Sequence, residues 1–135
     1  MGSMTMPADD RQPQSLKGTR VLVIEDEYFI AYDVRRILTS AGAEIVGPVA
    51  TVAKAQAAID DASFDCVVLD LNLQGESAIP IADRLAADGR VFAIATGYGS
   101  PAIPEHLKGM PRIEKPYDPA ALLKLVEQLE CVKAK

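Results

Sequence analysis

A doubly wound α/β sandwich with a five-stranded parallel sheet is the fold that this sequence predicts. From about Thr19 onward, short apolar runs alternate with segments of helical period, as in successive strand–helix units. Runs such as VLVI are continuously apolar, which is typical of strands that are covered on both faces. The 135 residues suffice for one domain but not for two ordinary ones. We therefore predict one three-layer domain of the flavodoxin-like kind.

The first 17 residues precede the predicted fold and show no periodic apolar pattern. They are polar and contain proline, so we expect a disordered tail at residues 1–17. The opening MGSM resembles the remnant of an expression tag and is excluded from the fold. The folded domain is expected to span residues 18–133.

Five apolar runs are predicted to form the strands of the sheet. Each is short enough for a strand and is separated from the next by a helical segment or a turn. In chain order the runs are RVLVIE at 20–25, AEIVGPV at 43–49, FDCVVLDL at 64–71, VFAIAT at 91–96 and RIEK at 112–115.

Apolar stripes of helical period lie between these runs. Asp118 and Pro119 suit the N-cap and the first position of the last helix. The fourth helix is predicted to be short or irregular and its segment mobile, because SPAIPEHLKGMP contains two early prolines and a glycine. The stripes of the other four helices consist of Ile30, Val34, Ile37 and Leu38; Val52, Ala55 and Ile59; Ala78, Ile81, Ala82 and Leu85; and Leu122, Leu125, Val126 and Leu129.

The composition argues against several classes of partner. With 19 acidic and 14 basic residues and a net charge of -5, the chain has no broad basic surface for a nucleic acid backbone. No apolar run approaches the roughly 20 residues that span a bilayer, and the N-terminus lacks the pattern of a signal peptide. We therefore expect a cytoplasmic protein that contacts neither nucleic acid nor membrane.

Polar residues follow the predicted strands at the points where they end. Glu25 and Asp26 follow the first strand and Asp70 ends the third; Thr96 and Lys115 follow the fourth and fifth. The carboxyl ends of parallel strands meet at one edge of a sheet, where ligands bind in this kind of fold. Three carboxylates there would repel one another without a hard cation, and their oxygen atoms suit Mg²⁺. Taken alone, Asp26 would equally suit a helix N-cap.

Asp70 is the candidate nucleophile, because an aspartate at the end of the apolar run VVLD has little structural reason to be there. A carboxylate can take a phosphoryl group when Mg²⁺ bridges it to the phosphate and other groups neutralise the charge. Lys115 offers a compact positive charge, and Thr96 offers a hydroxyl donor to a phosphate oxygen. Gly97 would let the backbone approach that phosphate.

With this arrangement the sequence resembles the receiver domain of bacterial two-component response regulators, over about residues 18–133. The resemblance implies a cis bond between Lys115 and Pro116, which a proline permits at modest cost. It implies the following roles: Glu25 and Asp26 as the acidic Mg²⁺ pair, Asp70 as the phosphoacceptor, Asn72 as a metal ligand through its backbone carbonyl, Thr96 as the switch hydroxyl and Lys115 as the charge-pairing lysine.

One position departs from the usual receiver pattern. Most receivers have an aromatic residue three positions before the lysine, and here Arg112 occupies it. The stretch IATGY at 94–98 resembles a receiver subgroup with a Phe-Ala-Thr-Gly-Tyr motif, and residues 70–85 are similar to that group as well. Members of the subgroup are associated with histidine kinases of the HWE type. Our hypothesis is that Tyr98 and the segment 97–109 carry the phosphorylation signal instead of the usual aromatic.

Other charged residues have a plainer interpretation. His106 has no second histidine or cysteine nearby, so we do not expect it to bind a metal. Arg35 and Arg36 are expected to face solvent on the first helix. Because that helix also meets the kinase in receivers, a contribution to docking is a second interpretation of these arginines.

The resemblance implies a phosphoacceptor rather than an enzyme. Asp70 would take its phosphoryl group from a histidine kinase or a histidine-containing phosphotransfer protein, with a stand-alone receiver as the first expectation and a fragment of a larger regulator or hybrid kinase as the alternative. A phosphatase of the haloacid dehalogenase type is disfavoured, since Asn72 stands where its general acid is needed. A flavodoxin-like redox protein is disfavoured too, because Glu25 and Asp26 would repel a flavin phosphate.

Overall fold

Five parallel strands form one sheet in the order β3-β2-β4-β7-β8. The structure is a computed structural model that describes residues 14–97 and 102–134, with side chains to residue 129. This order is the one found in flavodoxin-like folds, and it confirms the predicted sheet. The strands are β2 (Arg20–Ile24), β3 (Glu44–Val49), β4 (Cys66–Asp70), β7 (Phe92–Thr96) and β8 (Arg112–Glu114).

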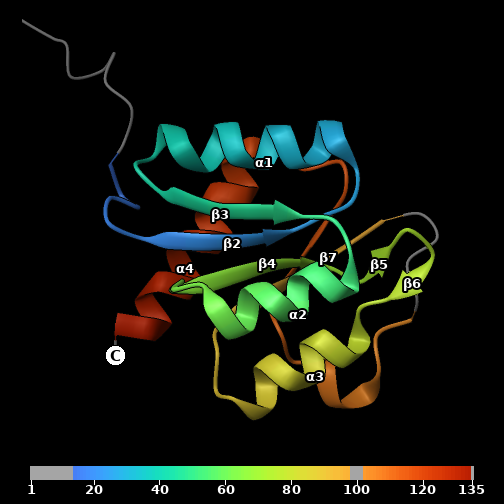
Figure 1. The fold of residues 1–135 in the computed structure, drawn as a ribbon. Helices are drawn as coiled ribbons and strands as arrows, with labels where there is room; N and C mark the ends of the chain where they lie inside the picture. Colours follow the sequence, from blue (N-terminus) through green and yellow to red (C-terminus); the bar gives the residue numbers. More distant parts are fainter. Residues whose placement is uncertain (1–13, 98–101, 135) are drawn as a thin grey trace, which may run out of the picture.

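Four α-helices cover the two faces of the sheet. Helices α1 (Tyr28–Ser40) and α4 (Pro119–Ala134) lie on one face, and α2 (Val52–Asp61) and α3 (Ile79–Ala87) lie on the other (Figure 1). Alternate residues of β2 point to opposite sides: Val21 and Val23 pack with α1 and α4, whereas Leu22 and Ile24 pack with α2 and α3. The sheet is therefore buried on both faces, as the continuous apolar runs predict.

The helical stripes are buried largely as predicted. Asp118 caps α4, because its Oδ2 accepts the Ala121 N–H at 3.0 Å. Three members of the stripes, Ile30, Val52 and Leu125, are only half-buried. The buried members of the stripes are Val34, Ile37, Leu38, Ala55, Ile59, Ala78, Ile81, Ala82, Leu85, Leu122, Val126 and Leu129.

A single 3₁₀ turn, η2 (Glu105–Leu107), stands where the short fourth helix is expected. Its Leu107 is fully buried in the core on the α2 and α3 side. On the surface, His106 Nε2 lies 2.6 Å from Asp83 Oδ1 of α3. The short, proline-rich segment is thus held by apolar packing on the α2 and α3 side of the sheet and by a polar contact with α3.

The small hairpin of β5 (Asn72–Leu73) and β6 (Glu76–Ser77) has no counterpart among the predicted elements. Its two-residue loop has positive φ at Gln74 (56°) and Gly75 (84°), the backbone geometry that two-residue hairpin loops favour. It directly follows β4. The hairpin therefore fixes the chain immediately after Asp70.

The packed structure reaches slightly further toward the N-terminus than residue 18. Leu16 is fully buried, and its N–H donates to Ala41 O at 2.9 Å at the end of α1. The rest of the expected tail, residues 1–13, lies outside the described residues. Within the described part of the chain, no helix has the length and apolar character that a membrane span requires.

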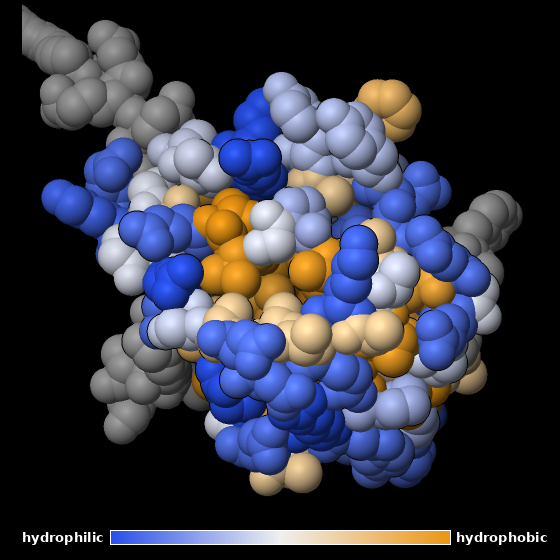
Figure 2. All heavy atoms as spheres, in the orientation of Figure 1, coloured by the Kyte–Doolittle hydropathy of each residue, from blue (hydrophilic) through white to orange (hydrophobic). Residues whose placement is uncertain are grey.

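Apolar surface is visible between α1 and α2, where the edge strand β3 lies (Figure 2). Ile45, Val46 and Val49 of this strand are only half-buried. The pairing of β3 with β2 shifts register after Leu22, beside Gly47 and Pro48. Such an irregularity blunts an exposed strand edge against pairing with another chain.

Candidate functional site

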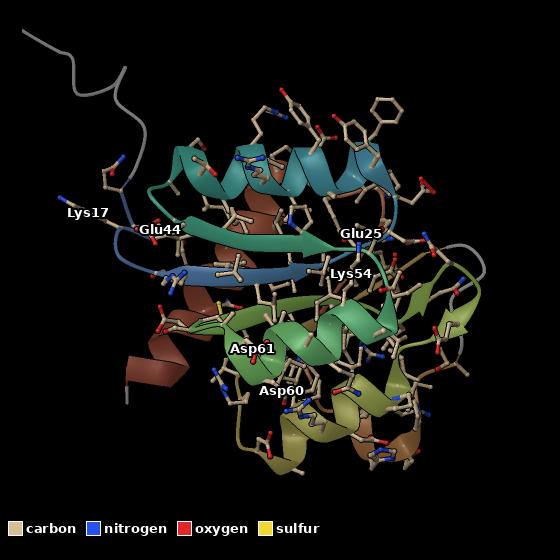
Figure 3. All side chains as sticks on the ribbon, in the orientation of Figure 1. Lys17, Glu25, Glu44, Lys54, Asp60 and Asp61 are labelled. Carbon is tan, nitrogen blue, oxygen red and sulfur yellow. The ribbon has the colours of Figure 1, made fainter. Side chains whose placement is uncertain are left out.

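Three carboxylates meet at the carboxyl ends of β2 and β4. Glu25 directly follows β2, as Figure 3 shows, and Asp70 is the last residue of β4. The two strands pair with Ile24 opposite Leu69, so the residues that follow are neighbours. One oxygen from each of Glu25, Asp26 and Asp70 lies within 4.8 Å of the others. The sequence prediction that these strand ends converge is thus confirmed.

Lys115 joins two of the carboxylates. Its Nζ lies 2.9 Å from both oxygens of Glu25 and 2.8 Å from Asp70 Oδ2. The three side chains are only 13%, 2% and 4% exposed, so water screens these contacts little. The lysine lies just after β8, where its N–H donates to Thr96 O at 2.7 Å.

The backbone around Lys115 has two features that place its side chain. The Lys115–Pro116 bond is cis, as the resemblance implies. Gly97 leaves room for the lysine stem: a Cβ at this glycine would lie 3.3 Å from Lys115 Cβ, tighter than most such contacts. The glycine after β7 therefore has a role that the sequence analysis missed, since it admits the lysine that crosses the site.

Backbone N–H groups hold the remaining carboxylate oxygens. Asp70 Oδ1 accepts the Asn72 N–H at 3.0 Å, and Asp26 Oδ2 accepts the Gln74 N–H at 2.9 Å. The β5–β6 hairpin therefore ties the two aspartates together. Asp26 does not act as a helix cap: the N-cap of α1 is Glu27, which makes no side-chain cap hydrogen bond.

The electrostatics reflect a crowded, partly desolvated triad. Burial raises the pKa of Glu25 from 4.5 to about 7; the negative charge of Asp70 adds to this, and the hydrogen bond from Lys115 offsets only part of it. Burial acts to lower the pKa of Lys115, but its hydrogen bonds to Asp70 and Glu25 outweigh that effect and raise it. The lysine therefore stays charged, while Glu25 binds a proton readily in the absence of a further cation.

Tyr117 is a site residue that the sequence analysis missed. Its hydroxyl oxygen lies 3.5 Å from Glu25 Oε1. Burial, followed by the negative charges of Glu25 and Asp70, raises the pKa of Tyr117, so the hydroxyl keeps its proton and can donate. The available signal was its position, two residues after the predicted lysine in the stretch KPYD.

A cavity of about 560 Å³ opens over this cluster. Asp26, Asp70, Asn72, Gly97 and Lys115 are among the residues that line it.

Two of the predicted switch residues, Thr96 and Arg112, are not among the residues that line the cavity. Thr96 ends β7 beside Asp70 but is not among the residues that line the cavity. Arg112 is exposed on the edge strand β8, where it borders a separate groove of about 180 Å³ with α4. Tyr98 lies outside the described residues. The structure thus assembles the acidic residues and the lysine, whereas Thr96 and Arg112 do not line the cavity.

The donor set fits Mg²⁺. The three candidate side-chain ligands are all carboxylates, and one lysine neutralises only part of their charge. Mg²⁺ prefers oxygen ligands and keeps several waters, for which the open cavity provides space.

Two aromatic side chains stand next to the cavity. Tyr28 and Phe29, at the start of α1, are 75% and 77% exposed and pack edge to face with ring centroids 5.4 Å apart. They follow Glu27, which lines the cavity. Large apolar side chains at such exposure, beside a site, mark a candidate contact surface for another protein.

Comparisons with known proteins assign this arrangement to one family. A family model described as the response regulator receiver domain matches residues 21–127. No significant match was found among curated proteins.

Several solved structures share the fold. SdrG from Sphingomonas melonis Fr1 is 34% identical, with a TM-score of 0.75 over 83% of this chain and 96% of that one. The response regulator PhyR from Brucella abortus is 27% identical, with a TM-score of 0.72 over 94% of this chain and 53% of its own. A CheY-like receiver domain protein from Methanospirillum hungatei JF-1 shares the fold at 15% identity, with a TM-score of 0.74 over 86% of this chain and 97% of its own.

Proposed function

The chain belongs to the response regulator receiver family, and on this premise we propose that Asp70 accepts a phosphoryl group from a histidine kinase or a histidine-containing phosphotransfer protein. The observation that carries the proposal is the position of Asp70, which ends a fully buried central strand at a cavity shared with Asp26 and Lys115. A buried carboxylate in contact with a lysine and two further acids is costly for stability alone. The arrangement is suited to receiving an anionic group together with a cation.

In the proposed transfer, one carboxylate oxygen of Asp70 attacks the phosphorus of a phosphohistidine. The new O–P bond forms as the N–P bond breaks, and the imidazole nitrogen keeps the electron pair. Mg²⁺, held by Glu25, Asp26, Asp70 and the backbone carbonyl of Asn72, would neutralise the phosphoryl oxygens when it is bound. Lys115 neutralises part of the developing charge, and the Thr96 hydroxyl donates to a phosphoryl oxygen once the group is in place.

We propose a phosphoacceptor rather than an enzyme with a separate substrate. The acyl phosphate on Asp70 is then lost by attack of water on phosphorus, which regenerates the carboxylate and releases inorganic phosphate. The residues that promote transfer also promote this loss, because both reactions place charge on the same phosphoryl oxygens.

The phosphoacceptor proposal is tested by incubating the protein with acetyl phosphate and Mg²⁺ and measuring its intact mass. The wild-type protein should gain one phosphoryl group, Asp70→Asn should gain none, and omission of Mg²⁺ should abolish the gain. Asp61→Asn removes an exposed carboxylate at the end of α2 (Figure 3) and should behave like wild type. Labelling of Asp70→Asn, or none of wild type with Mg²⁺, would contradict the proposal.

We further propose that the phosphodonor protein docks on the first turn of α1. Tyr28 and Phe29 are exposed beside the cavity rim, and Arg35 and Arg36 lie exposed further along the helix. A docked protein would cover the aromatic pair and bring its phosphohistidine over the cavity. Replacing Tyr28 and Phe29 by alanine should slow phosphotransfer from a protein donor at least tenfold and leave labelling by acetyl phosphate unchanged. Equal slowing with both donors would contradict this docking surface.

An HWE-type histidine kinase is the donor that we propose. The support is the similarity of residues 94–98 and 70–85 to the receiver subgroup associated with such kinases. Solved structures similar to this chain include several PhyR receivers. Phosphotransfer rates from a panel of HWE-type kinases and ordinary kinases test this, with the fastest transfer expected from an HWE-type kinase. Faster transfer from the ordinary kinases as a group would contradict it.

We propose that residues 97–109, with Tyr98 among them, transmit the phosphorylation signal to a partner protein by direct contact. They would take the place of the usual aromatic residue. Support comes from Arg112, an exposed arginine at the position of that aromatic. Signalling by protein contact applies whether the receiver acts alone or within a larger regulator. The test is Tyr98→Ala: binding of a downstream partner should lose its dependence on phosphorylation. Unchanged phosphorylation-dependent binding would remove Tyr98 from the account.

A further inference from the structure

We propose that Tyr117 is a positioning residue that holds Glu25 in place when Lys115 turns toward a phosphoryl group on Asp70. The inference rests on the proposed function, because it concerns the state in which Asp70 carries that group. It assigns a role to a tyrosine hydroxyl that the proposed transfer does not use.

Glu25 has three hydrogen-bond donors around it. Its Oε2 accepts the Glu27 N–H at 3.0 Å and the Lys115 ammonium at 2.9 Å. Its Oε1 lies 2.9 Å from the same ammonium and 3.5 Å from the Tyr117 hydroxyl. The tyrosine is therefore the donor next to Oε1 that does not depend on the lysine.

A phosphoryl group on Asp70 changes the demands on Lys115. The ammonium already lies 2.8 Å from Asp70 Oδ2, so the added anionic oxygens arise beside it. Its three protons must then serve more acceptors than before, and the contact with Glu25 is the one that weakens. Mg²⁺, which the proposed function also places on Glu25, would hold one of its oxygens. The other oxygen belongs to a side chain that is only 2% exposed and cannot replace the lost donor freely with water, so it needs another protein donor to stay in place.

Tyr117 can supply that donor because its ring is anchored independently of Lys115. The ring packs against the apolar cluster beneath α1 and α4. It also borders a small cavity of about 90 Å³ between these helices, next to Ile30, Ile37 and Pro119. When the lysine moves, the hydroxyl therefore stays beside Glu25 and can shorten its 3.5 Å contact.

The first test compares two ligands on Tyr117→Phe by NMR titration. Beryllofluoride, which mimics the phosphoryl group on Asp70, should bind roughly fivefold more weakly than to wild type in the presence of Mg²⁺, as expected for the loss of one hydrogen bond to a buried acceptor. Mg²⁺ alone should bind with less than a twofold change, because Lys115 still holds Glu25. Tyr32→Phe removes the same atom from an exposed tyrosine of α1 and should match wild type.

The outcomes separate this inference from the proposed function. If wild type itself does not bind beryllofluoride, the proposed function fails. If wild type binds it and Tyr117→Phe binds it equally well, or loses Mg²⁺ and beryllofluoride affinity to the same extent, only the positioning role is overturned.

A second test removes Lys115 and measures whether the Tyr117 hydroxyl then contributes more to stability. In a Lys115→Ala background the hydroxyl becomes the main side-chain donor to Glu25, so adding Tyr117→Phe should lower the urea midpoint clearly more than it does in wild type. Equal shifts in the two backgrounds would show that the contribution of the hydroxyl does not depend on Lys115, and would overturn the proposal.

Discussion

The acidic cluster is built very differently from the short elements η2 and β8. Glu25 and Asp70 are each 3% exposed and emerge from the adjacent strands β2 and β4. Arg112 is exposed on β8, an edge strand of three residues, and η2 is a single 3₁₀ turn. The difference shows that this fold keeps charged groups on its most buried strands and leaves the adjoining surface lightly packed.

A physical reason accounts for the contrast. Charges that must meet a phosphoryl group need positions fixed within a fraction of an ångström, and the neighbours of β4 in the sheet supply that rigidity. A surface that is read by a partner needs only to change on phosphorylation. Arg112 lies on the surface for which we propose this second role. If the two regions are separate, a substitution in one should leave the other unchanged.

Removing Lys115 should have the largest effect. Lys115→Ala leaves Glu25 and Asp70 buried without their shared cation, and breaking such a contact costs about 3–5 kcal/mol. We expect this loss in urea unfolding near neutral pH without Mg²⁺, and partial recovery when Mg²⁺ is added. Lys54→Ala, at an exposed position of α2 (Figure 3), should change stability by less than about 0.5 kcal/mol. A Lys115 variant as stable as wild type would contradict the account of the cluster.

The second prediction concerns a substitution outside the acidic cluster, at the buried leucine that anchors η2. Leu107→Ala deletes a fully buried side chain, which costs about 2–5 kcal/mol in typical cores. If the two regions are separate, Mg²⁺ affinity should change by less than about twofold while stability falls. A parallel fall in Mg²⁺ affinity, measured by NMR titration, would show that η2 supports the acidic cluster directly.

The pH dependence of the acidic cluster follows from the pKa of Glu25, which burial raises from 4.5 to about 7. A carboxyl group whose pKa is higher in the folded state contributes stability that is present below pH 4.5 and is lost as the pH rises to about 7. The Mg²⁺-free protein should therefore lose stability over this range, and Glu25→Gln should flatten the curve. Mg²⁺ affinity should rise over the same range as the carboxylate ionises. If stability instead increases between pH 4.5 and about 7, and Glu25→Gln removes this increase, the direction that we assign to the Glu25 contribution is wrong.

The surface contact of η2 should have the smallest effect. His106 and Asp83 are 61% and 48% exposed, and exposed pairs contribute between 0 and about 1 kcal/mol. His106→Gln should lower stability within that range and leave labelling of Asp70 by acetyl phosphate unchanged. A double-mutant cycle with Asp83→Asn isolates the pair, and a coupling well above 1 kcal/mol would mean that this contact is more than a surface bridge.

Much of the fold and the acidic cluster could be predicted because their signals are local. The run VLVI indicates a buried strand by itself, and the residues after the strands fall together once the sheet is parallel. The β5–β6 hairpin could not be predicted, because two-residue strands have no period and the turn Gln74–Gly75 is a weaker signal than Asn-Gly. Leu16 was missed since a lone leucine in a polar segment carries no pattern.

Contacts between distant residues were the other limit. Lys115 was predicted to face the acidic residues, but its joint contact with Glu25 and Asp70 depends on side-chain geometry that no spacing encodes. The approach of Tyr117 to Glu25 spans 92 positions, and that of His106 to Asp83 joins η2 to α3. Such contacts depend on how two elements pack and become visible only in three dimensions.

The most direct test of the account is an NMR amide titration with Mg²⁺, followed by beryllofluoride. The account predicts that Mg²⁺ shifts resonances around Glu25, Asp26 and Asp70, and that beryllofluoride then moves the resonances of Thr96 and residues 97–109. This result would join the rigid acidic cluster to the lightly packed surface beside it. If neither addition shifts these resonances, the acidic cluster does not bind Mg²⁺ or a phosphoryl group, and the central claim is wrong.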